Sequence, residues 1–334
     1  MTDNVYTQII LGAMTGDSIG AHVEFKQGGF SSKLLADAMA MKAGGTHGTA
    51  SGQITDDGEL ALGMLRSLNK HSCYITSDVL KEYKAWVESS PFDIGNTTAT
   101  ALRFPKCKTH EQIHYVRCKS GKGEANGALM RQAPLVAFGT KFETLENHIQ
   151  LAMTDASLTH GSDACLVASA FYNMLGRYLI EENVDEGSET LTRDELVNWC
   201  FNLAYIKTEE ACQAKDLDMT ALAKIKEAYL DIRKNKSLPE CHGWDQGHYL
   251  VAIKCTLWAL LNADSWDHGI ESIIHQGGDT DTNACIAGAL LSIIHEVPEW
   301  RCKLVIDCNT SLGRARPKEW RTEDNLKPYL KTFA

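Results

Sequence analysis

The stretch "HQGGDTDTNACIAGALLSIIHE", residues 275–296, joins an acidic, glycine-containing turn to a run of small and apolar residues. Asp279 and Asp281 are each followed by a threonine, and residues 283–295 are almost entirely apolar, which suits a helix buried on most sides. Neighbouring carboxylates repel each other, and burying them beside such a helix is costly unless they are paired or bind metal. No surplus of Lys or Arg lies beside them in the sequence.

Apolar residues recur with helical spacing elsewhere in the chain. The clearest segments are residues 5–14, 60–68, 164–179 and 251–261. Prolines number only 7, segments of alternating β-branched residues are scarce, and no repeat or linker is visible. We therefore predict an all-α fold, with one compact multi-helix domain over residues 1–334. The polar segment "EENVDEGSETLTRDE" (181–195) is the best candidate for a mobile loop.

Bulk composition excludes several classes of protein. The net charge of -10 argues against a generic nucleic-acid binder, which relies on Lys and Arg. The 11 cysteines are never spaced C-x-x-C, so a zinc ribbon is not expected. No apolar run reaches the ~18 residues that span a bilayer. With no signal peptide at the start, we expect reduced thiols, no membrane association and a cytoplasmic location.

Two more acidic clusters resemble the opening one in placement. They are "GAMTGDSIGAHVEF" (12–25) and "ITDDGE" (54–59), and each lies where a glycine-bearing loop meets an apolar helix. Asp and Thr are preferred at helix N-caps, so each cluster taken alone is explained by capping. Taken together, the clusters hold more carboxylates than capping needs. A pair of Mg²⁺ or Mn²⁺ ions would resolve the repulsion, because these ions prefer oxygen ligands.

Two other metal motifs were considered. "DTDTNA" begins like a calcium-binding loop, but Ala284 replaces the required glycine and Leu290 the bidentate glutamate. "HEQIH" (110–114) matches the H-E-x-x-H pattern of zinc proteases, but the pattern is short and no third ligand is recognisably spaced from it. A short surface helix explains "HEQIH" adequately.

In their order and spacing, the three clusters resemble the ADP-ribosylglycohydrolase family. The resemblance extends through "DIGNTTATAL", "ANGALMR" and "LTHGSDAC", so it covers most of the chain. It implies an all-α fold with a binuclear Mg²⁺ or Mn²⁺ centre in a cleft, with Asp281 bridging the two ions. The implied ligands are Glu24, Thr55, Asp56, Asp57, Asp279, Asp281 and Thr282. Their five carboxylates against two divalent ions would leave one net negative charge, which a cleft tolerates.

The resemblance also implies a substrate site. The residues expected to hold the ADP-ribose pyrophosphate and ribose are Gly95, Asn96, Gly123, Asn126, Gly127 and His160. Glycine-rich loops expose N–H groups to phosphate, which is compatible with this role. His160 is equally compatible with a structural role. Glu124, Ala125 and His248 depart from the family pattern; His248 stands where an aromatic contact to the substrate is expected.

The implied reaction is hydrolysis at the anomeric carbon of ADP-ribose carried by a modified protein. Glu24, Asp56, Asp57 and Asp281 are the expected catalytic residues, and the general acid or base among the first three is left open. Asp93 directly precedes Ile94 and Gly95. The resemblance implies that a carboxylate at this position pairs with the guanidinium of the modified arginine, so ADP-ribosylarginine is favoured. Asp93 is also explained by turn formation after "SSPF".

Several alternatives remain open at this level. The enzyme could act on ADP-ribosylserine or another ADP-ribose linkage. It could be an immunity protein against an ADP-ribosylating toxin, with segment 181–195 as the only visible extra contact surface. It could also be a non-catalytic, crystallin-like family member, although all seven implied ligand positions are intact.

Overall fold

The computed structural model describes residues 4–105, 107–184 and 191–331. Over these residues the chain forms sixteen α-helices, three short 3₁₀ helices and no β-strand, which confirms the all-α prediction. The α-helices are α1 (Val5–Gly20), α2 (Ser32–Met39), α3 (Asp56–His71), α4 (Thr76–Glu88), α5 (Asn96–Leu102), α6 (Thr109–Ser120), α7 (Ala133–Phe142), α8 (Leu145–Ser157), α9 (Asp163–Val184), α10 (Arg193–Ala214), α11 (Thr220–Asn235), α12 (Tyr249–Asn262), α13 (Trp266–Ile274), α14 (Thr280–Leu291), α15 (Glu299–Ile306) and α16 (Thr322–Leu330).

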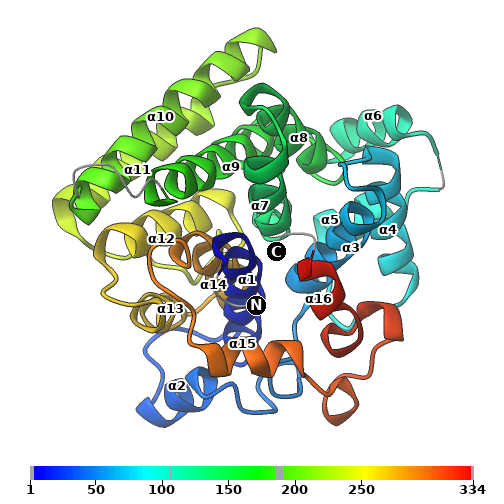
Figure 1. Ribbon diagram of the computed structural model, residues 1–334, viewed down its shortest axis with the longest axis vertical. Helices are drawn as coiled ribbons and strands as arrows, with labels where there is room; N and C mark the ends of the chain where they lie inside the picture. Colours follow the sequence, from blue (N-terminus) through cyan, green and yellow to red (C-terminus); the bar gives the residue numbers. More distant parts are fainter. Residues whose placement is uncertain (1–3, 106, 185–190, 332–334) are drawn as a thin grey trace.

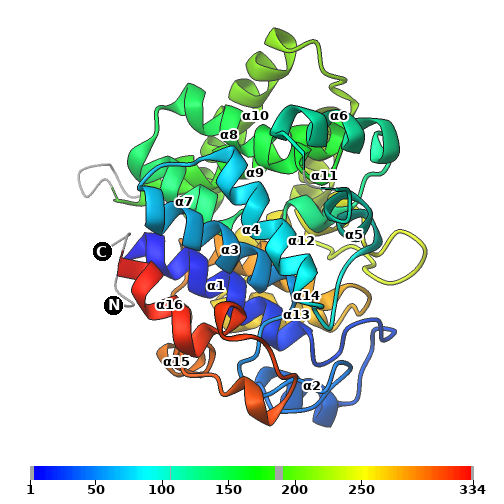
Figure 2. The same cartoon turned by 90° about the vertical axis from the view of Figure 1, so that its right-hand side faces the viewer.

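Helices α1 and α14 pack side by side at the centre of the molecule, although they come from opposite ends of the chain (Figures 1 and 2). Every residue of α14 is buried, as its apolar sequence predicts. α3, α12 and α13 also contact α14. The expectation of one domain over residues 1–334 stays a prediction, and this packing of distant segments agrees with it.

Glycines every fourth residue of α1 allow this close packing. Gly12, Gly16 and Gly20 lie on the face of α1 that contacts α14. A Cβ on Gly16 would lie 2.2 Å from the carbonyl oxygen of Ala284, and a Cβ on Gly20 would lie 2.4 Å from the Cα of Asp281. The backbone of α1 therefore lies directly against the first turn of α14, which carries the acidic residues.

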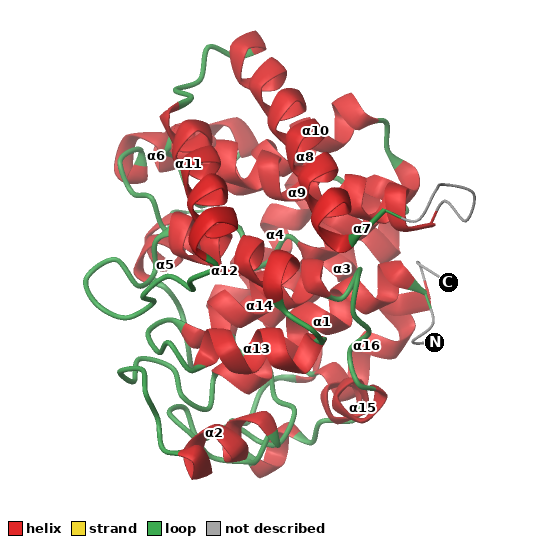
Figure 3. Ribbon diagram, turned by 90° about the vertical axis from the view of Figure 1, so that its left-hand side faces the viewer, coloured by secondary structure: helices red, strands yellow, loops and turns green. Residues whose placement is uncertain are grey.

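A second group of helices packs around α9, and the connecting loops gather along one side of the molecule (Figure 3). α9 packs against α7, α8, α10 and α11. The segments 5–14, 60–68, 164–179 and 251–261 all lie within helices, as their spacing predicts. Of the segment expected to be a mobile loop, residues 185–190 lie outside the described residues. Residues 181–184 belong to α9 and residues 193–195 to α10, so the expected loop was too long at both ends.

The "HEQIH" residues lie on α6, as expected for a short surface helix, and both histidines are exposed. All 11 cysteines are free thiols, in agreement with the expected reduced state. Among the described helices, none is long and apolar enough to cross a bilayer.

Candidate metal centre

Asp17 joins the first two acidic clusters. Its buried carboxylate accepts hydrogen bonds from the backbone N–H of Thr55 at 3.0 Å and of Gly58 at 2.9 Å. It also accepts one from the Thr55 hydroxyl at 2.8 Å. Asp17 lies in the C-terminal half of α1, so α1 holds the beginning of α3 in place.

The third cluster meets the second through side chains. The hydroxyl of Thr282 lies 3.4 Å from Oδ2 of Asp57, and the hydroxyl of Thr55 lies 3.4 Å from the same oxygen. The first turns of α3 and α14 therefore face each other, although Asp57 and Thr282 are far apart in the sequence.

Helix capping does not explain these acidic clusters. Thr55 and Asp279 occupy the N-cap positions of α3 and α14, but neither side chain accepts a hydrogen bond from a backbone N–H of its own helix. By contrast, Thr144 and Ser265 cap α8 and α13 in the ordinary way. The side chains at the α3 and α14 caps are turned toward the neighbouring clusters instead.

A group of four side chains forms the tightest part of the site. One ligand atom from each of Glu24, His47, Asp93 and Asp281 lies within 4.8 Å of the others. Nε2 of His47 contacts the carboxylate of Glu24 and lies 3.6 Å from Oδ2 of Asp93. This group includes two of the seven expected ligands, Glu24 and Asp281, and adds His47 and Asp93.

The other expected ligands surround this group, and two of them hold the neighbouring loops. Oδ2 of Asp56 accepts a hydrogen bond from the backbone N–H of Gly95 at 3.3 Å. Oδ2 of Asp279 accepts one from the side-chain amide of Asn126 at 2.7 Å. Two of the expected substrate residues, Gly95 and Asn126, therefore lie directly beside the acidic residues.

The carboxylates lack cationic partners. Within residues 4–105, 107–184 and 191–331, no lysine or arginine pairs with Asp56, Asp57, Asp279 or Asp281. Oδ1 of Asp57 and Oδ2 of Asp281 are buried without any hydrogen-bond partner among these residues. Such atoms are costly unless something not present in the chain satisfies them.

Burial controls the proton affinity of these groups. Loss of hydration raises the pKa of Asp56, Asp57 and Asp281 well above the usual aspartate value, and neighbouring carboxylates add to the effect. Burial also raises the pKa of Asp17 and of Glu24 to about 7. The hydrogen bond that His47 donates to the Glu24 carboxylate raises the pKa of His47.

The donor set fits hard divalent cations. It consists of carboxylate and hydroxyl oxygens with one imidazole, and two buried carboxylate oxygens are left unsatisfied. Mg²⁺ and Mn²⁺ prefer oxygen donors, and an imidazole is compatible with Mn²⁺. Positive charge at this point would compensate the mutual repulsion of the carboxylates.

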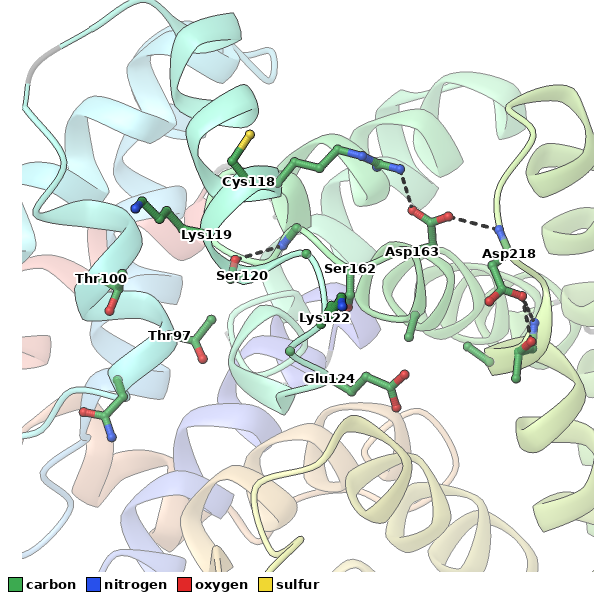
Figure 4. A pocket seen from close by; sticks show the side chains of 18 residues that line it. Thr97, Thr100, Cys118, Lys119, Ser120, Lys122, Glu124, Ser162, Asp163 and Asp218 are labelled. Atoms are coloured by element: carbon green, nitrogen blue, oxygen red, sulfur yellow. Dashed lines mark hydrogen bonds and ion pairs between the residues drawn. The ribbon is translucent and has the colours of Figure 1, made fainter.

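A pocket of about 930 Å³ adjoins the acidic residues (Figure 4). Asn96, Gly123 and Glu124 form its inner side, and Lys119 and Lys122 supply positive charge to its wall. None of the described residues that line it is an expected ligand. Asn96 follows Gly95, which contacts Asp56, and Gly123 and Glu124 precede Asn126, which contacts Asp279. The two loops therefore connect the pocket with the acidic centre.

Ion pairs and hydrogen bonds close one rim of this pocket. The Asp163 carboxylate lies 3.0 Å from the Arg117 guanidinium and accepts a hydrogen bond from the backbone N–H of Asp218 at 3.1 Å (Figure 4). These contacts join the end of α6, the beginning of α9 and the turn before α11. The wall of the pocket is thus built from three separate segments.

His160 lies behind the substrate loop and does not line the pocket. A Cβ on Gly127 would lie 3.1 Å from its ring, so a larger residue here would fit only if the His160 ring moved slightly. Burial lowers the pKa of His160 to about 3, and the imidazole is therefore neutral. Nδ1 lies 2.8 Å from the Thr159 hydroxyl, and Nε2 has no partner among the described residues.

His248 contacts Glu124, which also departs from the family pattern and lies on the other loop. Its Nε2 lies 2.8 Å from the Glu124 carboxylate, and Nδ1 accepts a hydrogen bond from the backbone N–H of Leu250. The backbone N–H of Asn126 donates to Gly247 at 2.9 Å. The three departures from the family pattern therefore lie together, because His248 contacts Glu124 and forms a β-bridge with Ala125.

Two residues of the site were missed by the sequence reasoning. Asp17 lies in the first cluster but is not among the expected ligands, and His47 lies in the glycine-rich segment "GGTHGTASGQ" (44–53). The signal available for His47 was a histidine within a glycine-rich loop that follows the first cluster closely. No local pattern shows that its ring would reach Glu24.

Comparison with known proteins identifies the family. The family model described as ADP-ribosylglycohydrolase matches residues 3–322. This chain belongs to the ADP-ribosylglycohydrolase family. The match spans all three acidic clusters and both loops that lead to the pocket, so the resemblance seen in the motifs is confirmed.

Individual ADP-ribosylglycohydrolases resemble the chain over nearly its full length. A protein of Acanthamoeba polyphaga mimivirus, described as an ADP-ribosyl glycohydrolase, is 27% identical over 332 residues, which are 93% of this chain and 95% of the relative. The ADP-ribosyl-(dinitrogen reductase) glycohydrolase of Rhodospirillum rubrum is 25% identical over 316 residues, 91% of each chain. A solved ADP-ribosylglycohydrolase-related protein complex shares the fold, with a TM-score of 0.66, 21% identity and coverage of 99% of this chain and 97% of that chain.

Proposed function

We propose that this ADP-ribosylglycohydrolase is a metal-dependent enzyme that removes ADP-ribose from modified proteins, with ADP-ribosylarginine as its preferred linkage. One observation carries the proposal. Carboxylates from three distant segments converge with no lysine or arginine partner among the described residues, and buried oxygens of Asp57 and Asp281 are left unsatisfied. A pair of Mg²⁺ or Mn²⁺ ions is the occupant that this donor set favours.

Glu24, Thr55, Asp56, Asp57, Asp279, Asp281 and Thr282 are the proposed ligands. Asp281 is the best candidate for the bridge, because it belongs to the tightest group and keeps one free oxygen. When bound, divalent cations supply the positive charge that orients ribose hydroxyls and water. Asp17 has a positioning role, since it fixes the backbone of the Thr55 turn.

We assign proton transfer to Glu24, with Asp56 and Asp57 as the alternatives. Glu24 contacts His47, and burial raises the Glu24 pKa to about 7. That pKa belongs to the metal-free protein; bound cations would lower it, so Glu24 would act as the ionised carboxylate that accepts a proton. Asp56 and Asp57 are held by Gly95, Thr55 and Thr282, which suits ligands better than proton carriers.

The pocket beside the centre is the proposed binding place for the diphosphate and adenosine of ADP-ribose. Its volume of about 930 Å³ lies within the range of small-molecule sites. The backbone of residues 120–124 and the side chains of Lys119 and Lys122 provide donors for phosphate oxygens. Asn96 and Asn126, with Gly95, Gly123 and Gly127, would place the ribose between the pocket and Asp279. His160 would support this loop as a neutral ring behind Gly127.

Asp93 is the proposed partner of the arginine guanidinium. Its side chain is 19% exposed, against 4% for Glu24, so it is the member of the group that an incoming side chain reaches first. A carboxylate can form two parallel hydrogen bonds with a guanidinium, which a serine linkage cannot offer. We also propose a cytoplasmic location, with which the free thiols agree.

The test is incubation with arginine-linked and serine-linked ADP-ribosyl peptides, with and without EDTA, followed by detection of free ADP-ribose. We expect release from the arginine-linked peptide, loss of release in EDTA, and a loss of the arginine preference in Asp93→Ala. Equal release from both linkages, unchanged in Asp93→Ala, would remove the assignment of arginine. Full activity in EDTA would remove the metal-dependent mechanism.

A further inference from the structure

One basic side chain beside the acidic centre has no acidic partner. The Arg314 guanidinium lies over the ring of Phe92, 5.3 Å from its centroid. Arg314 is exposed, and among the described residues it forms no ion pair with a carboxylate. Its guanidinium is therefore available to an anionic group from outside the chain.

The backbone around Arg314 is fixed by a buried glutamine. Oε1 of Gln53 accepts a hydrogen bond from the N–H of Arg314 at 2.9 Å, and Nε2 of Gln53 donates to its carbonyl at 2.6 Å. Gly313 packs so closely that a Cβ would lie 2.0 Å from the nitrogen of Ala50. The guanidinium is therefore carried on a fixed backbone and lies over the Phe92 ring.

Phe92 connects Arg314 with the group of Glu24, His47, Asp93 and Asp281. The Phe92 ring is 6.0 Å from the ring of His47, and His47 contacts Glu24 and Asp93. A hollow of about 560 Å³ lies between Ser90–Phe92 and Gly313–Arg316. Arg316 also lines this hollow, but its guanidinium is already paired with Glu59 at 2.7 Å. Arg314 is thus the available cation of the hollow among the described residues.

The segment from residue 92 to 96 connects the hollow with the acidic group and with the large pocket. Phe92 contacts Arg314, Asp93 belongs to the acidic group, the N–H of Gly95 contacts Asp56, and Asn96 lines the large pocket. If the ADP part occupies the pocket and Asp93 meets the leaving group, then Arg314 faces the protein that carried the modification.

We propose that Arg314, supported by Phe92, binds a carboxylate of the substrate protein next to the ADP-ribosylated side chain. This inference rests on the proposed function for its orientation. It makes Arg314 a specificity-determining residue for acidic sequence around the modification site. An exposed guanidinium ordered by an aromatic face suits a carboxylate, because its planar donors match two oxygens.

The test uses ADP-ribosylated peptides that differ only at the flanking residue, which is Glu, Gln or Lys. For the wild type we expect KM to be roughly two- to five-fold lower for the Glu peptide than for the Gln peptide, the range that an exposed ion pair gives. In Arg314→Gln this difference disappears while kcat stays unchanged, and in Arg314→Lys part of it remains. Lys234→Gln, which removes an exposed charge on α11, is the matched control and keeps the preference.

Two results would overturn the proposal. The first is an Arg314→Gln enzyme that keeps the wild-type preference for the Glu peptide. The second is an equal rise in KM for all three peptides together with weaker inhibition by free ADP-ribose, which would show that Arg314 binds the diphosphate instead. Serine-linked versions of the three peptides, and fluorescence anisotropy of the labelled peptides, measure the flank preference even if arginine-linked peptides are not cleaved.

Discussion

At the scale of single residues, the carboxylate of Asp17 holds the acidic turn of α3 in place. It accepts three hydrogen bonds from Thr55 and Gly58, and it is fully buried. Asp17→Asn would replace one acceptor oxygen with an amide donor that faces these N–H groups. We expect metal affinity or activity to fall by roughly 10- to 100-fold, as for other residues that orient metal ligands.

Calorimetric titration with Mn²⁺ and the rate of ADP-ribose release measure this effect. Asp37→Asn, at a surface ion pair with Lys42, is the matched control and should behave as the wild type. Asp17→Asn with wild-type affinity and rate would show that the hydrogen bonds of Asp17 serve only the fold.

Some residues of the site can be predicted from their local sequence, and others cannot. The proposed ligands at 55–57 and 279–282 could be predicted because they lie in short acidic motifs at the starts of α3 and α14, and they stay a prediction. His47 was missed because its partner Glu24 lies 23 residues away and only the folded loop brings them together. The buried pair of Arg131 and Asp155, 2.9 Å apart, was also missed, because neither residue differs in its local sequence from a surface charge.

At the scale of elements, the packing of α1 against α14 positions the first turn of α14. Gly16→Ala would place a Cβ 2.2 Å from the carbonyl oxygen of Ala284. Alanine normally stabilises a helix by up to ~1 kcal/mol relative to glycine. Overpacking against Ala284 should outweigh this stabilisation. We therefore expect the free energy of unfolding to fall by ~1–3 kcal/mol.

Urea denaturation measures the change, with Gly63→Ala in α3 as the control. A Cβ at Gly63 would lie 3.3 Å from the nearest atom of the Trp320 ring, an approach that a small shift relieves. A Gly16→Ala chain that is as stable as the wild type would contradict the close contact of α1 with α14.

Helices with strong apolar periodicity were predictable from sequence, and α1, α3, α9, α12 and α14 all lie where the spacing placed them. Short helices such as α2 and α5 were not assigned, because seven or eight residues carry too little periodicity to separate them from loops. The boundary of the polar segment 181–195 was misjudged because Glu181 and Glu182 are polar residues at the end of a helix that is otherwise apolar.

At the scale of the whole molecule, the acidic centre should make metal-free stability depend on pH. Burial raises the pKa of Asp17 and of Glu24 to about 7 from 3.8 and 4.5. The folded state therefore binds protons more tightly than the unfolded state. This contribution to stability is fully present below the ordinary carboxylate values and is lost as the pH rises to about 7. His47, whose pKa is raised, acts in the same direction.

We expect EDTA-treated protein to melt at a lower temperature at about pH 8 than at about pH 5.5. Mn²⁺ should remove most of this difference, because a cation replaces the protons that the carboxylates otherwise retain. Differential scanning calorimetry in matched buffers measures both effects. Metal-free protein that is equally stable or more stable at the higher pH would contradict the burial of unpaired carboxylates.

The convergence of these carboxylates on divalent cations is tested most directly by equilibrium dialysis with Mn²⁺ and direct measurement of bound metal. We predict about two ions per wild-type chain and loss of tight binding in Asp281→Ala, with Asp231→Ala on the exposed face of α11 as the control. A wild-type chain that retains no Mn²⁺, or an Asp281→Ala chain that retains as much as the wild type, would contradict the account.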